Sequence, residues 1–279
     1  MTSGDGGGFF WLERDGQVAR IAVAGCADRE EPRRHGGSVH WEFAALLNRL
    51  RTDNGVRVIV ITGAADGEFW VPPPTAVEGA AHSRKHRSDP AALWRTFTGI
   101  TQLHQAMAEI EKPIVARVNG DAVGTGSSVL FNSDLSVAVA DALVADHHLG
   151  MGDIPRYGSS FGMVPGDGGL SLVPLHMTPM QAKEYLMLAK PYRAGELATM
   201  GLINLAVPAG DFGALDAAVD DLTERLLRRP AYALAWTKRV VNRRVAEHLN
   251  LTADAAAGYE LVTYLQHEMQ DDAQSQTLE

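Results

Sequence analysis

Residues 112–126 read Lys-Pro-Ile-Val-Ala-Arg-Val-Asn-Gly-Asp-Ala-Val-Gly-Thr-Gly, and residues 162–174 read Gly-Met-Val-Pro-Gly-Asp-Gly-Gly-Leu-Ser-Leu-Val-Pro. In each stretch an apolar, strand-like segment runs into a glycine-rich turn and then into a predicted helix. A glycine turn at a helix start presents unpaired backbone N–H groups, which can hold a phosphate or the oxyanion of a reaction intermediate. The second turn also carries the carboxylate of Asp167, and this extra group indicates chemistry.

The composition bounds the class of protein. The chain has 279 residues, 46% of them hydrophobic, which suits one catalytic domain with a small appendage. Its net charge of −9 argues against nucleic acid or an anionic membrane as a general partner. A single cysteine, Cys26, excludes an internal disulfide framework and fits a reducing cytoplasm. No apolar run approaches the length of about 18 residues that a membrane span needs, so we expect none.

Alternating patterns predict an α/β fold. Four short runs rich in Val and Ile are typical of buried strands: Gln17–Ala24, Val56–Thr62, Ile114–Val118 and Leu135–Val139. Helical patterns lie between them, at Val39–Leu50 and Ala92–Ile110. Strands that alternate with helices favour crossover connections.

The chain changes character after residue 210. Leu and Ala then repeat at helical spacing, Pro230 divides a helix over Leu215–Arg228 from one over Ala231–Glu247, and a third helix is predicted to begin at Asn250. We therefore expect a disordered tail over residues 1–8 with no signal peptide, a core domain over 9–210, and a helical oligomerisation region over 211–279.

Seven segments in consistent order resemble the crotonase (enoyl-CoA hydratase/isomerase) superfamily. They are Val56–Gly63, Lys112–Gly126, Ser133–Asp141, Val164–Gly169, Ala182–Leu188, Gly201–Pro208 and Trp236–Asn242. The resemblance spans roughly residues 9–245 and implies a spiral of β-β-α units. It also implies a small-molecule substrate and self-association as a trimer or a dimer of trimers through the helical C-terminal region.

The two glutamates that the resemblance implies for hydratases are missing here. The first position lies six residues before Asp134 and is Ser128, and the second lies seven residues before Pro165 and is Gly158. Neither residue is acidic, which argues against hydration by two glutamates at these positions.

His148 and Asp167 are the remaining acid/base candidates. Residues 145–149, Ala-Asp-His-His-Leu, resemble a subgroup in which a histidine faces the aspartate of the second glycine turn. A carboxylate bound to one imidazole nitrogen fixes the tautomer and makes the other nitrogen a better base. An apparent insertion over Gly150–Tyr157 separates the two here. The alternatives are a surface histidine pair with a helix-capping Asp167, and His147 as the base.

The same subgroup includes β-diketone hydrolases of the 6-oxocamphor hydrolase type. Residues 37–41, Gly-Ser-Val-His-Trp, resemble the segment whose tryptophan walls their substrate pocket, so Trp41 is either such a wall or plain helix core. Glu260 lies near the place of their assisting carboxylate. Their substrate-contacting histidines align with Leu46 and Gly126, so this match is partial.

The predicted oxyanion hole is also unusual. The family donates one N–H from a loop that here reads Phe-Trp-Val-Pro-Pro-Pro over residues 69–74, and the donor falls on Pro73, which has no N–H. The second donor is the N–H of Thr125. We expect Val71, Gly126 and Ser128 to contact the substrate.

Coenzyme A binding receives little support from the sequence. The basic aromatic tail of acyl-CoA members is missing, and a charge run at residues 84–87 is typical of a solvated loop. We expect no cofactor and no metal site, since the His82–His86 pair also lies in this polar loop.

Three functions remain open. The first is hydrolytic, retro-Claisen cleavage of a carbon–carbon bond in a β-diketone, with His148 and Asp167 as the acid/base pair and Thr125 stabilising the oxyanion. The second is an acyl-CoA hydratase or isomerase with atypical acid/base residues. The third is a non-catalytic crotonase-like scaffold.

Overall fold

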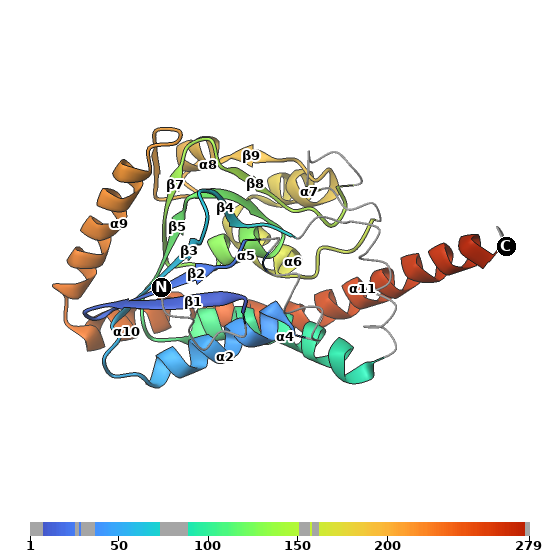
Figure 1. Cartoon of the computed structure of the whole chain (residues 1–279), viewed down its shortest axis with the longest axis horizontal. Coiled ribbons are helices and arrows are strands. Elements are labelled where there is room, and N and C mark those ends of the chain that lie inside the picture. Colours follow the sequence, from blue (N-terminus) through green and yellow to red (C-terminus); the bar gives the residue numbers. More distant parts are fainter. Residues whose placement is uncertain are drawn as a thin grey trace.

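The computed structural model describes residues 8–25, 28, 37–72, 89–150, 157 and 162–276, with side chains described up to residue 266. The predicted disordered tail over residues 1–8 and Cys26 lie almost entirely outside this part of the chain, as do the loop over residues 73–88 and most of the 150–157 insertion. Figure 1 shows two twisted sheets surrounded by helices.

The larger sheet has the strand order β1-β2-β3-β5-β7-β10. β1 and β2 pair antiparallel, and the strands from β2 onward pair parallel. Its strands are β1 (Phe10–Asp15), β2 (Val18–Val23), β3 (Val58–Gly63), β5 (Ile114–Val118), β7 (Leu135–Val139) and β10 (Leu205–Val207). β3, β5 and β7 are almost wholly buried, which explains their continuous runs of Val, Ile and Ala.

A smaller sheet lies beside the larger one, in the order β4-β6-β8-β9. Its strands are β4 (Gly67–Trp70), β6 (Gly120–Val123), β8 (Leu143–Ala145) and β9 (Tyr192–Arg193). Each central strand of the large sheet is followed in the chain by a strand of the small sheet, β3 by β4, β5 by β6 and β7 by β8. A helix then returns the chain. This repeated β-β-α unit confirms the predicted crotonase-like α/β fold.

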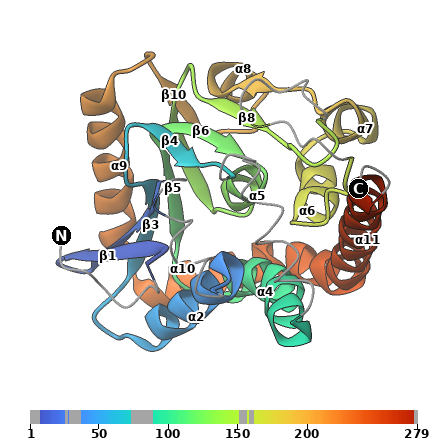
Figure 2. The same ribbon diagram turned by 45° about the vertical axis from the view of Figure 1, so that its right-hand side comes forward.

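Helices cover the two sheets. They are α2 (Val39–Thr52), α4 (Pro90–Glu109), α5 (Thr125–Phe131), α6 (Gly169–His176), α7 (Pro179–Met187), α8 (Ala194–Thr199), α9 (Phe212–Leu227), α10 (Ala231–Val241) and α11 (Arg243–Gln276). Figure 2 shows α9 along one flank of the large sheet, with α2, α4 and α11 forming a layer below it. α5 and α6 lie between the sheets and α11.

The C-terminal helices differ from the sequence prediction at one boundary. The break falls at Asn242, whose side chain donates to the backbone oxygen of Ala108 in α4. α11 then continues through Asn250, whereas the sequence pattern predicts that a new helix begins there. Asn250 instead accepts a hydrogen bond from Gln105 of α4, so its polar side chain ties two helices together.

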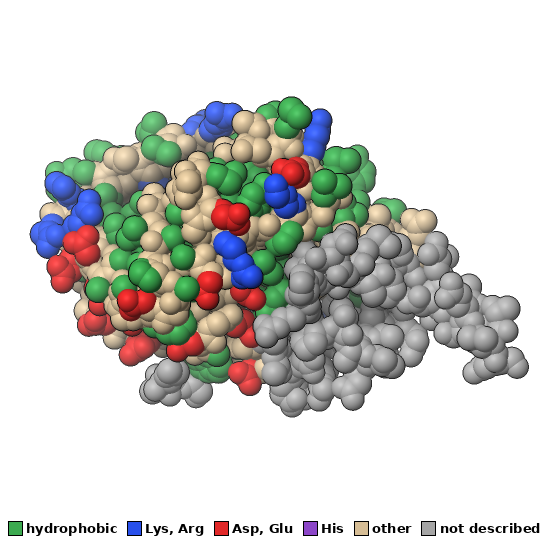
Figure 3. Space-filling model, turned by 90° about the horizontal axis from the view of Figure 1, so that it is seen from above, with side chains coloured by type: hydrophobic (Ala, Val, Ile, Leu, Met, Phe, Trp, Pro, Cys, Tyr) green, Lys and Arg blue, Asp and Glu red, His purple; other side chains and the backbone are tan. Residues whose placement is uncertain are grey.

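The surface is mixed in character. On the face seen in Figure 3, basic and acidic side chains of the described residues are both scattered among apolar ones. Among the helices that the structure describes, none is both long enough and apolar enough to cross a membrane.

Candidate active site

The two glycine turns identified in the sequence form the floor of the site. Gly124 caps α5 with a φ of 61°, and Gly168 caps α6 with a φ of 84°. Both angles lie in the left-handed region that glycine adopts without steric cost. Thr125 is the first residue of α5, so its N–H has no partner within the helix and is suited to bind an oxyanion.

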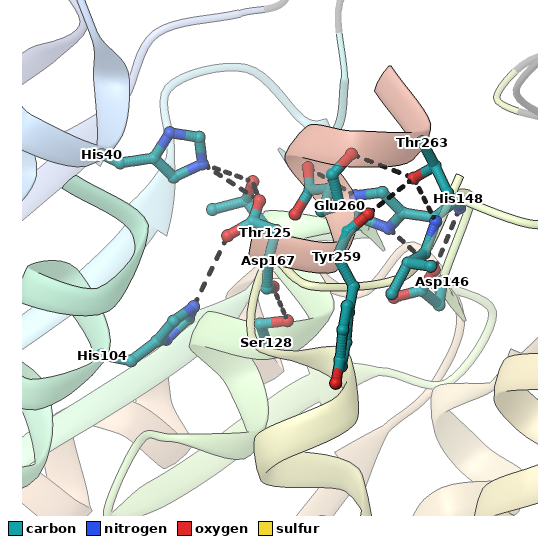
Figure 4. Close-up of polar contacts among 11 residues, drawn as sticks. His40, His104, Thr125, Ser128, Asp146, His148, Asp167, Tyr259, Glu260 and Thr263 are labelled. Atoms are coloured by element: carbon teal, nitrogen blue, oxygen red, sulfur yellow. Dashed lines mark hydrogen bonds and ion pairs between the residues drawn. The ribbon is translucent and has the colours of Figure 1, made fainter. Parts of the chain in front are cut away.

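Asp167 lies in the second turn and is held by three helices. His40 of α2 places Nε2 3.0 Å from Asp167 Oδ2, and the hydroxyl of Thr125 donates to the same oxygen. His104 of α4 places Nε2 3.5 Å from Oδ1. Ser128 of α5 donates to the backbone oxygen of Asp167 at 2.6 Å. Figure 4 shows the carboxylate between the two imidazole rings.

His148 belongs to a second group. Its Nδ1 lies 2.9 Å from Oδ1 of Asp146, which also accepts the backbone N–H of His148 at 3.0 Å. Its Nε2 lies 3.6 Å from Oε1 of Glu260 on α11. Asp146, His148 and Glu260 thus form a buried row next to the Asp167 cluster (Figure 4).

The predicted direct pairing of His148 with Asp167 is therefore replaced by two separate pairings. Asp146 precedes His148 by two residues and forms a hydrogen bond with its Nδ1. The carboxylate oxygens of Asp167 instead face His40 and His104. The alternative of a surface histidine pair with a helix-capping Asp167 does not hold either. His148 is only 3% exposed, and Gly168, not Asp167, is the cap of α6.

The pKa values of two buried carboxyls, Asp167 and Glu260, are shifted in opposite directions by their surroundings. Burial opposes ionisation of Asp167, but the neighbouring imidazoles of His40 and then His104 outweigh it, so the pKa of Asp167 lies well below its usual range. Burial raises the pKa of Glu260 above its usual range, against the opposing pull of His148. Asp167 is therefore a carboxylate, and Glu260 retains a proton more readily than an ordinary glutamate.

The imidazole of His148 is shifted as well. Burial disfavours its charged form, but the Asp146 carboxylate and then Glu260 outweigh this cost and raise the pKa of His148 well above its usual value. Burial likewise opposes the charge of Asp146, but His148 lowers the pKa of that carboxyl overall. These opposite shifts favour an Asp146 carboxylate paired with a protonated His148.

The other predicted residues lie around these groups. Trp41 is half-buried on α2, with its ring 5.0 Å from that of Trp94. Val71 is buried after β4, and Gly126 packs against the backbone oxygen of Trp70. The ring of His147 lies 4.4 Å from that of His148 and packs on Gly124.

Several predicted positions lie outside the described residues. They are Pro73 and Pro74 of the oxyanion loop, Gly158, and the charged loop with His82 and His86. Among the residues that are described, no group of His, Cys, Asp or Glu side chains is arranged to hold a metal ion.

Sequence reasoning did not select His40, His104 or Asp146. His104 lies on the buried face of α4 beside Leu103 and Met107, where a histidine is easily taken for core. His40 directly precedes Trp41, and Asp146 lies two residues before His148. Their closeness in the sequence to these two candidates is the signal that could have identified them.

Exposure separates the groups that can meet a substrate from those behind them. The side chains of His40 and Glu260 are each 11% exposed. His104, His148 and Asp146 are 1%, 3% and 0% exposed. Each of these two outer side chains therefore contacts a more deeply buried group, His40 the carboxylate of Asp167 and Glu260 the imidazole of His148.

A fold of β-β-α units with glycine turns over buried carboxyl and imidazole groups defines an enzyme of the crotonase superfamily. The family model "Enoyl-CoA hydratase/isomerase" matches residues 38–276, and the chain belongs to this family. Carnitinyl-CoA dehydratase of Proteus mirabilis is 26% identical over 229 residues, covering 82% of this chain and 78% of that protein.

Solved structures show the same fold. An enoyl-CoA hydratase/isomerase from Mycobacterium paratuberculosis superposes with a TM-score of 0.77 at 24% identity, covering 95% of this chain and 96% of the other. A β-diketone hydrolase from Anabaena sp. PCC 7120 superposes with a TM-score of 0.73 at 19% identity, covering 92% and 94%. At these identities the likeness concerns the fold, and the predicted membership of the superfamily is confirmed.

Proposed function

We propose that this enzyme is an acyl-CoA hydratase or isomerase with a relocated acid/base set. One observation carries the proposal: a single buried site holds two carboxyl groups in different surroundings, Asp167 between the imidazoles of His40 and His104, and Glu260 beside His148. These surroundings displace the pKa values of the two carboxyls in opposite directions. Adding water to an enoyl thioester, or moving its double bond, requires one group that takes a proton and another that gives one. Carboxyl groups with diverging pKa values suit these two roles.

The relocation has a structural basis. Ser128 stands where hydratases of the resembling family carry their first glutamate, and its hydroxyl binds the backbone oxygen of Asp167. Asp167, in the second glycine turn, therefore lies next to the position where the first glutamate is missing, and its carboxylate can take the place of that glutamate. Glu260 enters from α11 and packs over Gly166, so it supplies the second carboxyl from the C-terminal helix.

In this mechanism Asp167 acts as the base and Glu260 as the proton donor. His148, which is backed by Asp146, lies with its Nε2 3.6 Å from Glu260 Oε1 and replenishes the proton of Glu260. The N–H of Thr125 binds the oxyanion of the thioester enolate as negative charge develops there. Trp41, Val71, Gly126 and Ser128 border the acyl group. The chemistry uses side chains and a backbone donor and requires no cofactor.

Hydrolytic cleavage of a β-diketone is the second candidate. The observation that favours it is the buried Asp146–His148 pair, because an imidazole oriented by a carboxylate is an effective base for water. Water would attack one carbonyl, the carbon–carbon bond would break, and the released enolate would be protonated. The raised pKa of His148 weighs against this role, since a base must be neutral when it acts.

Self-association as a trimer or a dimer of trimers is proposed for the assembly. Tyr232, Trp236 and Val240 recur every fourth residue along α10 and are 64%, 67% and 75% exposed. An apolar stripe of this kind on the helical C-terminal region is typical of an interface between subunits.

The two activities are distinguished by offering crotonyl-CoA and a cyclic 1,3-diketone to the same preparation. The proposal expects turnover of the thioester, and losses of about 10²-fold in Asp167→Asn and Glu260→Gln. Glu184→Gln, on the surface of α7, is the matched control. Thioester turnover should fall with rising pH as the Glu260–His148 pair loses its proton. Diketone cleavage that rises with pH, with the thioester untouched, would support the second candidate instead.

A further inference from the structure

The Asp167 carboxylate is surrounded by two imidazoles and a hydroxyl, from His40, His104 and Thr125. We propose that His40 and His104 are positioning residues, which hold the Asp167 carboxylate from two sides and keep it ionised and oriented toward the substrate. This inference rests on the proposed function, in which Asp167 is the base. It assigns a role to two histidines that belong to different helices and that act through Asp167.

The rings of His40 and His104 approach Asp167 from different sides. His40 Nε2 approaches Oδ2 at 3.0 Å and His104 Nε2 approaches Oδ1 at 3.5 Å, so each imidazole addresses a different oxygen. The rings converge because α2 and α4 pack closely. A side chain at Gly99 of α4 would lie 2.8 Å from the backbone nitrogen of Trp41, so glycine permits this approach.

The backbone around Asp167 also favours these contacts. Gly168 has a φ of 84°, and a Cβ there would lie 2.5 Å from His104 Nε2 and 2.7 Å from Ser128 Cβ. Glycine thus lets the His104 ring reach the turn. Ser128 meanwhile binds the backbone oxygen of Asp167 at 2.6 Å. Both the main chain and the carboxylate of Asp167 are fixed.

His104 is shielded from the substrate by its burial. His104 is 1% exposed, so it is out of reach of a substrate and can act on one only through Asp167. The polar groups that face Asp167 are His40 from α2, His104 from α4, Thr125 from α5 and, electrostatically, Glu260 from α11. Behind Glu260 lies His148. Removing either imidazole leaves Asp167 beside Glu260 with less compensating charge, which makes its ionised form less stable.

A direct test follows the Asp167 carboxyl itself. The protein is labelled with ¹³C at the aspartate carboxyl carbon, and the signal that Asp167→Asn removes is titrated by NMR. In His40→Leu and His104→Leu the pH at which Asp167 titrates should rise by about 1 pH unit or more, the usual effect of removing a neighbouring group that favours the ionised form. His40→Gln, which keeps an N–H donor, should restore part of the difference. His176→Leu, in α6, is the control and should leave the titration unchanged.

Kinetics provide the second readout. With a thioester substrate, kcat should fall while KM changes little, and the acidic limb of the pH–rate profile should move to higher pH. An Asp167 titration that is the same in all variants overturns the proposal. If His104→Leu does not fold, the His40 variants decide the matter alone. If the titration shifts but Asp167→Asn keeps full activity, the positioning role stands and the proposed base role of Asp167 fails.

Discussion

His148 Nε2 lies 3.6 Å from Glu260 Oε1, and this contact joins the segment after β8 to the C-terminal helix α11. The helical C-terminal region therefore contributes a side chain to the site as well as covering it. Thr263, one turn later on α11, accepts the backbone N–H of Val164 at 3.1 Å and fixes the helix against the second glycine turn. The placement of Glu260 thus depends on the docking of α11.

Replacing Glu260 by glutamine should show whether the site needs the ionisable carboxyl group or only a side chain of that size. The amide keeps the size of the side chain but cannot donate or take up a proton, so we expect kcat/KM to fall by about 10²-fold, as for loss of a general acid. Steady-state kinetics with a thioester substrate measure the effect. Tyr259→Phe is the matched control, because Tyr259 is adjacent on α11 and 63% exposed. Equal activity of the two variants would contradict the role of Glu260.

The stability that His148 contributes should depend on pH. Its pKa is raised in the folded protein, so its contribution is fully present below the ordinary histidine pKa of about 6.5 and is lost as pH rises through the raised value. His148→Asn should therefore be less stable than the parent at pH 6, and the difference should shrink in alkaline solution. Urea unfolding at a series of pH values tests this. A difference that stays constant across the series would show that the Asp146–His148 ion pair contributes nothing.

Gly168 should tolerate substitution worse than another glycine of positive φ elsewhere in the chain. Gly168 and Gly210 both have positive φ, so alanine at either costs about 1–2 kcal/mol of backbone strain. Only at Gly168 would the new Cβ meet His104 and Ser128, whereas at Gly210 it meets open space. We expect Gly168→Ala to lose more unfolding free energy than Gly210→Ala, and to lose activity as well. Indistinguishable values for the two variants would show that the close approach of His104 is not required.

The sequence predicted the parts of this architecture that are local. β5 and β7 have the predicted bounds because four of the five residues in each strand are buried and β-branched or small. The two glycine turns were recognisable because each precedes a helix. Side chains that come together only through the packing of helices could not be recognised from the sequence. His40 and His104 reach Asp167 only because α2 and α4 cross closely at Gly99, a contact between segments far apart in the chain.

The fixing of α10 to the core should depend on one buried ion pair. Lys238 Nζ lies 2.7 Å from Asp134 Oδ2 and 3.0 Å from the backbone oxygen of Lys112. Lys238→Met leaves the Asp134 carboxylate without its cation, which typically costs about 3–5 kcal/mol. Arg225→Met, which breaks an exposed pair with Asp221, should cost about 0.5 kcal/mol or less. Chemical denaturation measures both, and equal losses would contradict the prediction.

The apolar stripe on α10 should be required for assembly. Tyr232, Trp236 and Val240 lie on one side of the helix, because residues four apart share a face, and the rings of Tyr232 and Trp236 pack edge to face. A glutamate in place of Trp236 puts a charge in the centre of this stripe, where burial against another subunit would be costly. We expect the parent protein to be a trimer or a dimer of trimers by light scattering, and Trp236→Glu to shift toward the monomer. Met187→Glu on α7 replaces a side chain that is 66% exposed and should leave the mass unchanged. A parent protein that is monomeric at micromolar concentration, or a Trp236→Glu variant with the parent's mass, would show that this face is not the interface.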